Sequence, residues 1–483
     1  MIPFELKSIL VFLVALFGSI FIIPKLSNIA IRIGLVDVPY GRKDHPGPRP
    51  LVGGIGIVIS ATFCCLVFVP ISGLRGFFLG LSVLLFAGFL DDFRELGPYQ
   101  KFTAQVIACA LLMYFSHITL LSFGNLIGEK ALKLPDWDLI IWLVTIFCIV
   151  GVINALNMID GLDGLAGGVS FIAFIAFAIH ASFVGQYSLM FLNLAFAGSV
   201  LGCLRYNWYP AKLFMGDAGS ICIGFSLGYM SIALTQNANF DTPPVVALLI
   251  LSVPIVDTVV VMAKRILRGE SPFVADRYHL HHILLNFGLN KIQSVKVILC
   301  ISSFLAILSF ASPIFNLSDR TMFAIFIVYT LCYLGATFYM LLHVRQSPHT
   351  LQVAVRSKKT KFLSLLDIVR IIRRSNRYDV YLQCVCMQVS NDDSEKNGWV
   401  KNISNDGFLF VTQSYFEASE SFIARITFPF EHYTHIIELP CQRIWFAKVK
   451  DDEWVHGFRF LQFDGMQEQL LFKFLVKQKA KSS

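Results

Sequence analysis

Residues 154–168 read Asn154-Ala155-Leu156-Asn157-Met158-Ile159-Asp160-Gly161-Leu162-Asp163-Gly164-Leu165-Ala166-Gly167-Gly168. The stretch combines two carboxylates, two carboxamides and four glycines, and it separates two apolar runs that are each long enough to cross a bilayer. Carboxylates at the end of a membrane helix are costly to desolvate, and glycines let the backbone approach a ligand closely. The stretch therefore predicts a binding or catalytic site rather than a polar loop that only connects two helices.

The composition is that of a polytopic membrane protein. The chain has 483 residues, 55% hydrophobic content, 15% charged residues and a mean hydropathy of +0.65. The net charge of +8 fits a cytoplasmic excess of Lys and Arg and an anionic membrane surface. No nucleic-acid-binding module occurs, so no nucleic acid polymer is expected as a partner. Cys384 and Cys386 form a Cys-x-Cys pair without a second pair at metal spacing, which favours a core or barrel-face position over a zinc site.

About eleven apolar segments of roughly twenty residues are predicted to span the membrane. They lie near 8–24, 53–71, 74–90, 102–121, 138–156, 165–184, 187–205, 219–235, 244–263, 295–315 and 321–343. The first segment is expected to be a retained helix and not a cleaved signal peptide. One set of loops carries only Arg75, Lys130, Lys133 and Arg320, whereas the other carries fourteen Lys and Arg residues. The richer set is predicted to face the cytoplasm, together with everything after residue 345.

Five polar clusters fall on the predicted cytoplasmic side, at 43–54, 91–92, 154–164, 214–220 and 276–282. Because one topology places all five on one face, they predict a single site. The adjacent carboxylates Asp91 and Asp92 repel each other unless a cation or a proton lies between them, so a divalent metal, a catalytic base and a solvated helix end all stay open. Asp217 is flanked by glycines and fits either a Mg²⁺ ligand or a helix N-cap. The histidines at 279–282 fit either pyrophosphate binding or a transition metal.

The motifs occur in an order and spacing that belong to one family. They are Asp91-Asp92, Asn154-x-x-Asn157-x-x-Asp160-Gly-x-Asp163-Gly-Leu, Phe214-Met-Gly-Asp217-x-Gly-Ser and His279-x-His281-His282. Over residues 1–345 the chain resembles the polyprenyl-phosphate N-acetylhexosamine-1-phosphate transferases, which include the WecA and MraY enzymes. The first loop, with Lys43 and the Gly53-Gly54 pair, is also similar to theirs. The form of the histidine motif resembles the WecA branch.

The resemblance implies a reaction and a location. N-acetylhexosamine 1-phosphate, expected to be the GlcNAc form, would pass from a UDP-sugar to undecaprenyl phosphate with release of UMP, which initiates a cell-envelope glycan. The family uses Mg²⁺, with Mn²⁺ as an alternative metal. The enzyme would lie in the bacterial inner (cytoplasmic) membrane, in contact with membrane lipid, with its active site on the cytoplasmic side. A homodimer is left open.

The resemblance also implies residue roles. The implied catalytic residues are Asp91, Asp92, Asp160, Asp163 and Asp217, of which Asp217 also binds the metal. The implied substrate-binding residues are Lys43, Lys101, Asn154, Asn157, Phe214, Arg277, His279, His281 and His282. Among these, Lys101 would meet the lipid phosphate and the histidines would support the diphosphate. Which aspartate acts as a base stays open.

The last third of the chain is of a different kind. Residues 346–372 are predicted to be a basic juxtamembrane linker on anionic lipid, and residues 373–483 a cytoplasmic domain. Alternating apolar residues predict strands near 381–389, 407–412, 422–428, 436–449 and 454–463, and a helical tail is predicted at 466–477. Short strands separated by turns favour a small β-barrel. The expected fold is therefore a polytopic α-helical membrane domain followed by a β-barrel.

Two motifs of this domain resemble the signatures of PilZ domains, which bind cyclic di-GMP. They are Arg373-Arg374-x-x-Arg377 and Asn402-x-Ser404-x-x-Gly407. Arginines can hold phosphates bidentately and stack on guanine, although the arginine run also fits a membrane-facing basic patch. Asn402 replaces the commoner Asp. The resemblance implies that cyclic di-GMP regulates the transferase.

Two functions from other classes are weighed against transfer. A transporter would use buried carboxylates as a proton relay, but the carboxylates here lie at the ends of the predicted spans and not at mid-membrane. A catalytically inactive membrane anchor for a nucleotide-sensing domain would show eroded motifs, and none of the four motifs is eroded.

Overall fold

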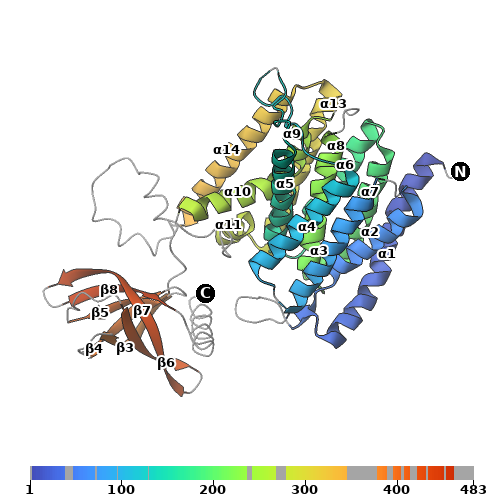
Figure 1. Ribbon diagram of the computed structural model, residues 1–483. Helices are drawn as coiled ribbons and strands as arrows, with labels where there is room; N and C mark the ends of the chain where they lie inside the picture. The colour runs from blue at the N-terminus through green and yellow to red at the C-terminus, as the bar shows by residue number, and fades with distance from the viewer. Residues whose placement is uncertain are drawn as a thin grey trace. The chain divides into compact units, whose positions relative to one another are not determined.

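The structure, a computed structural model, describes most of the chain in two stretches. It describes residues 3–344 apart from 38–46, 71–72, 95, 129, 237–241 and 268–278, and residues 378–461 apart from 389–394, 404–406, 414–420, 431–432 and 451–452. These residues form one compact unit of helices and one of strands (Figure 1). The predicted linker at 346–372 and the predicted helical tail lie outside the described residues. The predicted domain boundaries stay predictions.

Fourteen helices are described in the first unit. They are α1 (Phe4–Ile33), α2 (Gly53–Phe68), α3 (Arg75–Arg94), α4 (Pro98–Ser116), α5 (Asp138–Ile159), α6 (Leu165–Phe183), α7 (Tyr187–Asn207), α8 (Asp217–Thr235), α9 (Pro244–Ile250), α10 (Ser252–Leu267), α11 (Leu280–Asn286), α12 (Lys291–Ser309), α13 (Ala311–Phe315) and α14 (Asp319–Val344). Two short strands, β1 (Val36–Asp37) and β2 (Arg49–Pro50), pair antiparallel between α1 and α2.

Eight of the described helices are long and apolar enough to cross a membrane, or nine if α9 and α10 count as one span bent by 78°. The predicted count of eleven is therefore not confirmed, although a helix or a broken helix pair covers every predicted span. The predicted spans missing from the eight are α2, which has only 16 residues, α4, and the bent pair α9 and α10. The chain is a multi-pass membrane protein with a helical membrane domain.

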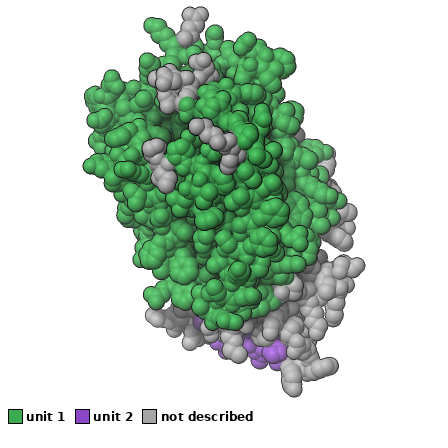
Figure 2. All heavy atoms as spheres, turned by 90° about the vertical axis from the view of Figure 1, so that its right-hand side faces the viewer, with its two compact units in different colours: residues 1–38, 46–360 green, residues 39–45, 361–483 purple. Residues whose placement is uncertain are grey.

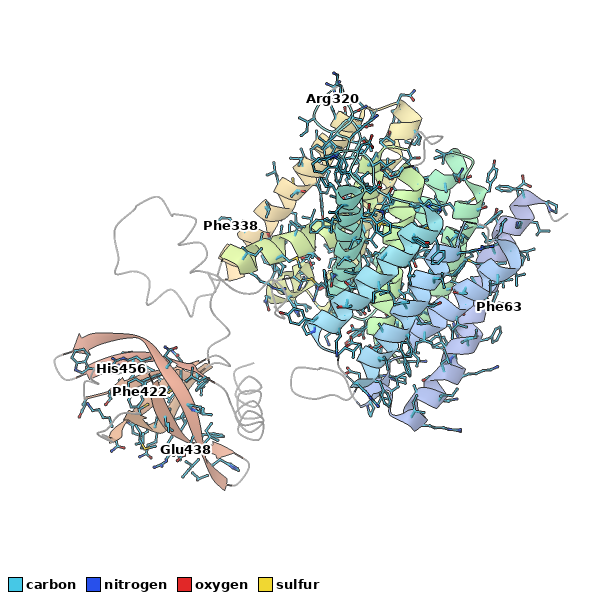
Figure 3. The ribbon with its side chains drawn as sticks, in the orientation of Figure 1. Phe63, Arg320, Phe338, Phe422, Glu438 and His456 are labelled. Atoms are coloured by element: carbon cyan, nitrogen blue, oxygen red, sulfur yellow. The ribbon has the colours of Figure 1, made fainter. Side chains whose placement is uncertain are left out.

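The outer flank of this unit is apolar. Phe63 on α2 and Phe338 on α14 point away from the packed interior with 59% and 43% of their surface exposed (Figure 3). Figure 2 shows the heavy atoms of this unit in green. Large apolar side chains exposed over many helices are what a lipid-facing surface requires, because lipid tails are as apolar as the side chains themselves.

The helical unit has two ends of different character. At one end, Gln236 after α8 accepts a hydrogen bond from the Leu121 N–H (2.9 Å), and Asp319 at the start of α14 accepts one from the Asn125 N–H (2.8 Å). Arg320 marks this end in Figure 3. Because α8 finishes here, its first residue lies at the opposite end. The ends of α3 and α5 and the starts of α2 and α4 also lie at that opposite end.

Helix α8 is the centre of the unit, and nearly all of its residues are buried. It packs against α2, α3 and α5. The contact with α3 is close because Gly88 lacks a side chain: a Cβ atom there would overlap the backbone of Ala218. This approach brings Asp91 and Asp92, one turn further along α3, over the first turn of α8.

The second unit is a closed barrel of six antiparallel strands in the order β3-β4-β5-β8-β7-β6. The strands are β3 (Tyr378–Gln388), β4 (Glu395–Ile403), β5 (Gly407–Thr412), β6 (Ser421–Phe430), β7 (Tyr433–Lys450) and β8 (Glu453–Phe460). Phe422 and His456 are buried inside, whereas Glu438 lies on the outside and binds Arg425 (Figure 3). The predicted barrel is confirmed.

Two details of the barrel bear on the sequence predictions. Strand β4 was not among the predicted strands, because Lys, Asn and Gly interrupt its apolar alternation. Cys384 and Cys386 are buried in the core with their sulfur atoms 4.0 Å apart, which confirms the prediction of a core position.

Candidate active site

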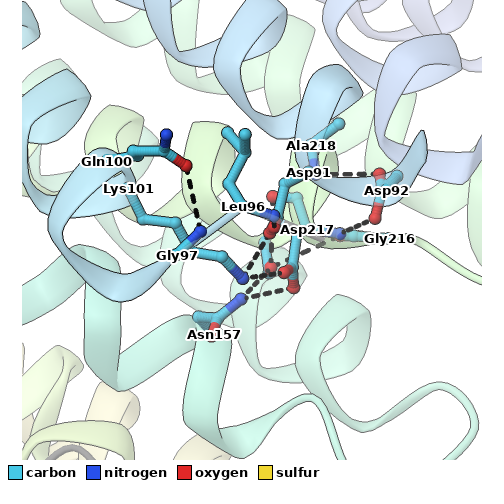
Figure 4. A network of polar contacts seen from close by, with 11 residues as sticks. Asp91, Asp92, Leu96, Gly97, Gln100, Lys101, Asn157, Gly216, Asp217 and Ala218 are labelled. Carbon is cyan, nitrogen blue, oxygen red and sulfur yellow. Dashed lines mark hydrogen bonds and ion pairs between the residues drawn. The ribbon is translucent and has the colours of Figure 1, made fainter. Parts of the chain in front are cut away.

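One cationic side chain connects two carboxylates at the α8 end described above. The Lys101 ammonium, from the first turn of α4, forms ion pairs with the Asp91 and Asp217 carboxylates, the latter at 2.9 Å (Figure 4). The Asp91 side chain is 3% exposed and also accepts a hydrogen bond from the Leu96 N–H (2.7 Å). The Asp217 side chain is 35% exposed. Asp217 is therefore the carboxylate of this cluster that a ligand can reach.

Asn157 holds the other face of the Asp217 carboxylate. Its Nδ2 donates to Asp217 Oδ1 (2.8 Å) and to Ser220 Oγ (2.9 Å). Ser220 lies three residues after Asp217 and therefore on the same face of α8. Contacts from α4 and α5 thus fix the orientation of the carboxylate.

Asp92 caps α8 from a neighbouring helix. Its two carboxylate oxygens accept the N–H groups of Asp217 (2.7 Å) and Ala218 (3.1 Å), the first two residues of α8. Gly216 precedes them with a φ of 76°, and a Cβ atom there would overlap the Asp92 carboxylate. The alternative in which Asp217 itself caps the helix is wrong, because Gly216 occupies the N-cap position and the Asp217 carboxylate accepts from Lys101 instead.

A backbone ladder holds the Phe214 loop beside the start of α2. Phe214 donates its N–H to the Pro50 carbonyl (2.9 Å), and the Gly53 N–H donates to the Phe214 carbonyl (3.0 Å). These main-chain hydrogen bonds join the predicted cluster at 43–54 to the predicted cluster at 214–220. The structure assigns Phe214 a positioning contact, and its role in substrate binding stays a prediction.

The turn after α5 contributes the next carboxylates. Asp163 accepts a hydrogen bond from the Ala211 N–H (2.9 Å), which ties this turn to the loop before α8. Burial, together with the negative charges of Asp217 and Asp163, raises the pKa of Asp160 to about 7. Asp160 thus changes its protonation state near neutral pH, close to the Asp217 carboxylate.

The histidine motif reaches the same turn. A Cβ atom on Gly161 would overlap the imidazole of His281, so a glycine is required for this contact. The rings of His279 and His281 stack at 5.7 Å, and those of His281 and His282 lie 4.2 Å apart. Burial and the neighbouring His282 lower the pKa of His281 to about 3, so the ring is neutral. Within the described part of the chain, neither ring nitrogen of His281 has a hydrogen-bond partner.

Not every predicted residue joins this cluster. Asn154 lies one turn before Asn157, and its Nδ2 donates to Gln105 Oε1 on α4 (3.0 Å) and to the Val150 carbonyl of its own helix (2.8 Å). Lys43, Arg277, Arg373, Arg374, Arg377 and Ser404 lie outside the described residues. Asn402 and Gly407 lie in β4 and β5, in the other unit.

Sequence reasoning missed Ser220 and Asp257, which contact predicted residues, and Tyr333, which contacts Asp257. Ser220 stood inside a quoted motif but received no role. Asp257 on α10 accepts hydrogen bonds from the His279 ring (Nδ1, 2.7 Å) and from the Tyr333 hydroxyl (2.6 Å). A carboxylate inside the apolar run 244–263 is rare enough to have marked Asp257 as functional.

The donor set at this end fits a divalent cation. Asp91 and Asp217 carry two negative charges, and Lys101 supplies one positive charge. The cluster therefore keeps a net negative charge, which favours a further cation. Among the residues that the structure describes, no three Asp, Glu, His or Cys side chains come close enough to hold a metal by themselves. Mg²⁺ is commonly bound by one or two carboxylates and completed by substrate phosphates and water. Asp217, the carboxylate of this cluster that a ligand can reach, meets that requirement.

Comparison with known proteins relates this geometry to a family. The model of glycosyl transferase family 4 matches residues 74–235, which include Asp91 and Asp217. The undecaprenyl-phosphate alpha-N-acetylglucosaminyl 1-phosphate transferase of Haemophilus influenzae is 33% identical over 329 residues, which are 66% of this chain and 90% of that protein. The protein of the same name from Salmonella typhi is 34% identical over 296 residues, 60% of this chain and 80% of that protein.

A solved structure, that of the Bacillus subtilis inhibitor of motility (MotI/DgrA), is 20% identical and covers 23% of this chain and 53% of that chain with a TM-score of 0.20. A likeness this low supports no conclusion about fold or function. The relatives from Haemophilus influenzae and Salmonella typhi, in contrast, are matched over most of their own length. The chain therefore belongs to glycosyl transferase family 4, as a relative of the undecaprenyl-phosphate N-acetylglucosaminyl 1-phosphate transferases.

Proposed function

We propose that the chain transfers N-acetylglucosamine 1-phosphate from UDP-N-acetylglucosamine to undecaprenyl phosphate and releases UMP, at the cytoplasmic face of a bacterial inner membrane. The observation that carries the proposal is the joining of Asp91, Lys101 and Asp217 at one end of a membrane-spanning helical unit. A lipid-borne phosphate and a water-soluble nucleotide sugar can meet only at such an end. The names of the curated relatives support the substrates.

In the proposed reaction, an oxygen of the lipid phosphate attacks the phosphorus that carries the sugar. A new P–O bond joins the two phosphates, the bond between that phosphorus and the UMP oxygen breaks, and UMP leaves with the bonding electron pair. The lipid phosphate is already ionised at neutral pH, so the step depends mainly on positioning and charge neutralisation. Lys101 is placed to pair with a phosphate when it leaves one of its two carboxylates.

We propose that Asp217 holds Mg²⁺ in the working enzyme and that Mn²⁺ can replace it. When bound, the ion would neutralise the repulsion between two phosphate-bearing substrates. Asn157 keeps the Asp217 carboxylate in one orientation. Asp92 keeps the first turn of α8 in place. His281, neutral and packed on Gly161, can donate one hydrogen bond to a diphosphate oxygen.

The test of this proposal is transfer of radiolabel from candidate UDP-sugars to undecaprenyl phosphate by the purified protein. UDP-N-acetylglucosamine should give labelled lipid and UMP, and other UDP-acetamido sugars should give less. Absence of labelled lipid with every UDP-sugar would favour the inactive membrane anchor. Movement of label across a vesicle membrane without a lipid product would favour the transporter.

We further propose that the barrel is a PilZ-like domain that binds cyclic di-GMP and changes the transfer rate. The closed six-stranded barrel is compatible with such a domain. Asn402 on β4 and Gly407 at the start of β5 are the described positions of the second motif. A ligand can shift the activity only if its affinity differs between two states of the enzyme. The sign of the effect is left to measurement.

Calorimetry on the full-length protein tests this regulation, with Arg373→Ala, Arg377→Ala and Ser404→Ala as variants that should lose binding. Titration of the dinucleotide into the transfer assay then measures the change in rate. No binding at micromolar dinucleotide would contradict the proposal. Binding without a change in rate would make the barrel a module for localisation or partner recruitment.

A further inference from the structure

A buried carboxylate outside the Lys101 cluster is bonded from three directions. Asp257 on α10 is 1% exposed. Its Oδ2 accepts from His279 Nδ1 (2.7 Å), and its Oδ1 accepts from the Leu280 N–H (2.8 Å) and the Tyr333 hydroxyl (2.6 Å). The donors come from α14 and from the start of α11. A buried charge is tolerated only with such partners, because desolvation alone would cost several kcal/mol.

The contact with His279 decides which ring nitrogen meets a ligand. With Nδ1 donating to Asp257, Nε2 is the nitrogen that faces away from the carboxylate. With Nδ1 committed to Asp257, the ring can donate to a phosphate oxygen only from Nε2, when that nitrogen carries a proton. His279 in turn stacks on His281, which packs against Gly161 in the turn after α5.

Tyr333 adds a connection to the last helix of the unit. Its hydroxyl donates to the Asp257 oxygen that also accepts the Leu280 N–H, so α14 helps to fix the carboxylate that the histidine motif contacts. Tyr329, one turn earlier on α14, has its ring 6.4 Å from that of Tyr333. Its hydroxyl is buried and has no hydrogen-bond partner among the described residues.

We propose that Asp257 and Tyr333 are positioning residues, which orient His279 toward the diphosphate of the nucleotide substrate. The inference rests on the proposed function, because it assumes that the histidine motif supports the diphosphate. Asp257 selects the ring nitrogen, and Tyr333 fixes the carboxylate that selects it. Neither residue touches the substrate.

The experiment compares two hydroxyl deletions on one helix. Affinity for UDP is measured by calorimetry on the purified full-length protein, and the Michaelis constants for UDP-N-acetylglucosamine and undecaprenyl phosphate are measured by transfer. Tyr333→Phe should weaken UDP binding roughly fivefold to tenfold, because it removes one hydrogen bond to a charged group. Tyr329→Phe, the matched control, should change it less than about twofold, because it removes a hydroxyl without a partner.

Asp257→Asn provides the stronger perturbation. The amide cannot accept from both the His279 ring and the Leu280 N–H in the observed geometry, so UDP binding should weaken by more than about tenfold. The Michaelis constant for undecaprenyl phosphate should stay the same in all three variants. In a His279→Ala background, Tyr333→Phe should have no further effect on UDP affinity, because the two act through one interaction.

Three results would overturn the proposal. The first is an equal fall in melting temperature and turnover number in Tyr333→Phe and Tyr329→Phe with unchanged UDP affinity, which would make Tyr333 a packing residue only. The second is a loss of UDP affinity from Tyr333→Phe that is as large in the His279→Ala background as in the wild-type background. Wild-type protein that fails to bind UDP would refute the proposed function itself, whereas wild-type protein that binds UDP with unchanged affinity in Asp257→Asn would refute only the positioning role.

Discussion

Two aspartates of this protein satisfy the first N–H groups of a helix to which they do not belong. Asp92 on α3 accepts from the first two residues of α8, and Asp257 on α10 accepts from the Leu280 N–H at the start of α11. The first N–H groups of a helix carry a partial positive charge and have no partner within the helix. A carboxylate from a neighbouring helix satisfies them and fixes the angle between the two helices. The first turns of α8 and α11, which carry Asp217 and His281, are thereby held in place.

The first prediction concerns Asp92 as a cap. Asp92→Asn replaces one accepting oxygen by an NH₂ group that faces an N–H donor, so we expect a loss of about 1–3 kcal/mol in stability and a fall in transfer. Thermal unfolding and transfer are measured on the same preparations. If Asp92 acted instead as a base toward the substrate, the variant would lose transfer without any loss of stability.

The second prediction concerns Gly216. Gly216→Ala places a methyl group against the Asp92 carboxylate, so we expect loss of the cap and at least a tenfold loss of transfer. Gly185→Ala is the matched control, because Gly185 also has a positive φ (72°) but has no atom within 4 Å of the added Cβ. The control should lose only about 1 kcal/mol of stability from backbone strain. Equal losses of transfer in both variants would contradict the clash at Asp92.

At this scale the sequence predicts residue types better than residue contacts. The spacing of Asp91, Asp92 and Asp217 pointed to one site, and the structure brings the three together. The spacing of these residues along the sequence does not reveal that Lys101 lies between two of the carboxylates. It also does not reveal that Asp92 faces backbone N–H groups. Asp257 went unnoticed, although its place inside an apolar run could have marked it.

Among the elements, the break between α9 and α10 has a cause that the sequence does contain. Pro254 lies in the first turn of α10, where its missing N–H is tolerated, but its ring would clash with the carbonyl of the residue four positions earlier in a continuous helix. Helix α9 accordingly ends at Ile250, four residues before it. The hydropathy of 244–263 predicted one straight span because apolar content does not register a bend of 78°.

The third prediction concerns the barrel and a buried histidine. Burial, with the nearby Arg443 and Lys396, lowers the pKa of His456 from 6.5 to about 4. The folded barrel therefore favours the neutral ring, and the stability from this group is complete above pH 6.5 and is lost as the pH falls toward 4. We expect the free energy of unfolding of fragment 370–483 to drop by roughly 2–3 kcal/mol across that window.

Urea unfolding of the fragment at several pH values measures this drop. His456→Leu should flatten the dependence, since an apolar side chain has no proton to bind. The buried core of the barrel, with Phe408, Phe410 and Phe428, supports a fragment that folds by itself. A variant with the same pH dependence as the wild type would show that other groups cause the loss.

For the whole molecule, the arrangement of the two ends predicts a topology. Helix α14 begins beside Asn125, at the end opposite to Asp217, and its 26 residues are long enough to cross the membrane. Val344, the last residue of α14, therefore lies at the same end of the helical unit as the candidate active site. The excess of Lys and Arg in the loops predicts that this side is the cytoplasm.

The fourth prediction tests this orientation. A reporter fused after residue 345 should report the cytoplasm, and a reporter inserted at residue 239, between α8 and α9, should report the opposite side. The sequence predicted this division from charge alone, because Lys and Arg differ so strongly between the two sets of loops. The opposite result for both reporters would place the active site away from the pool of nucleotide sugars.

The central claim, metal-dependent transfer at Asp217, is tested most directly by one assay on the purified full-length protein. Labelled UDP-N-acetylglucosamine and undecaprenyl phosphate are mixed with wild type, Asp217→Asn and the control Asp319→Asn, a carboxylate at the far end of the helical unit. We predict labelled lipid with wild type and the control, its loss on addition of EDTA, recovery with Mg²⁺ or Mn²⁺, and at least a hundredfold loss in Asp217→Asn. Transfer that persists in EDTA, or in Asp217→Asn at the rate of the control, would contradict the account.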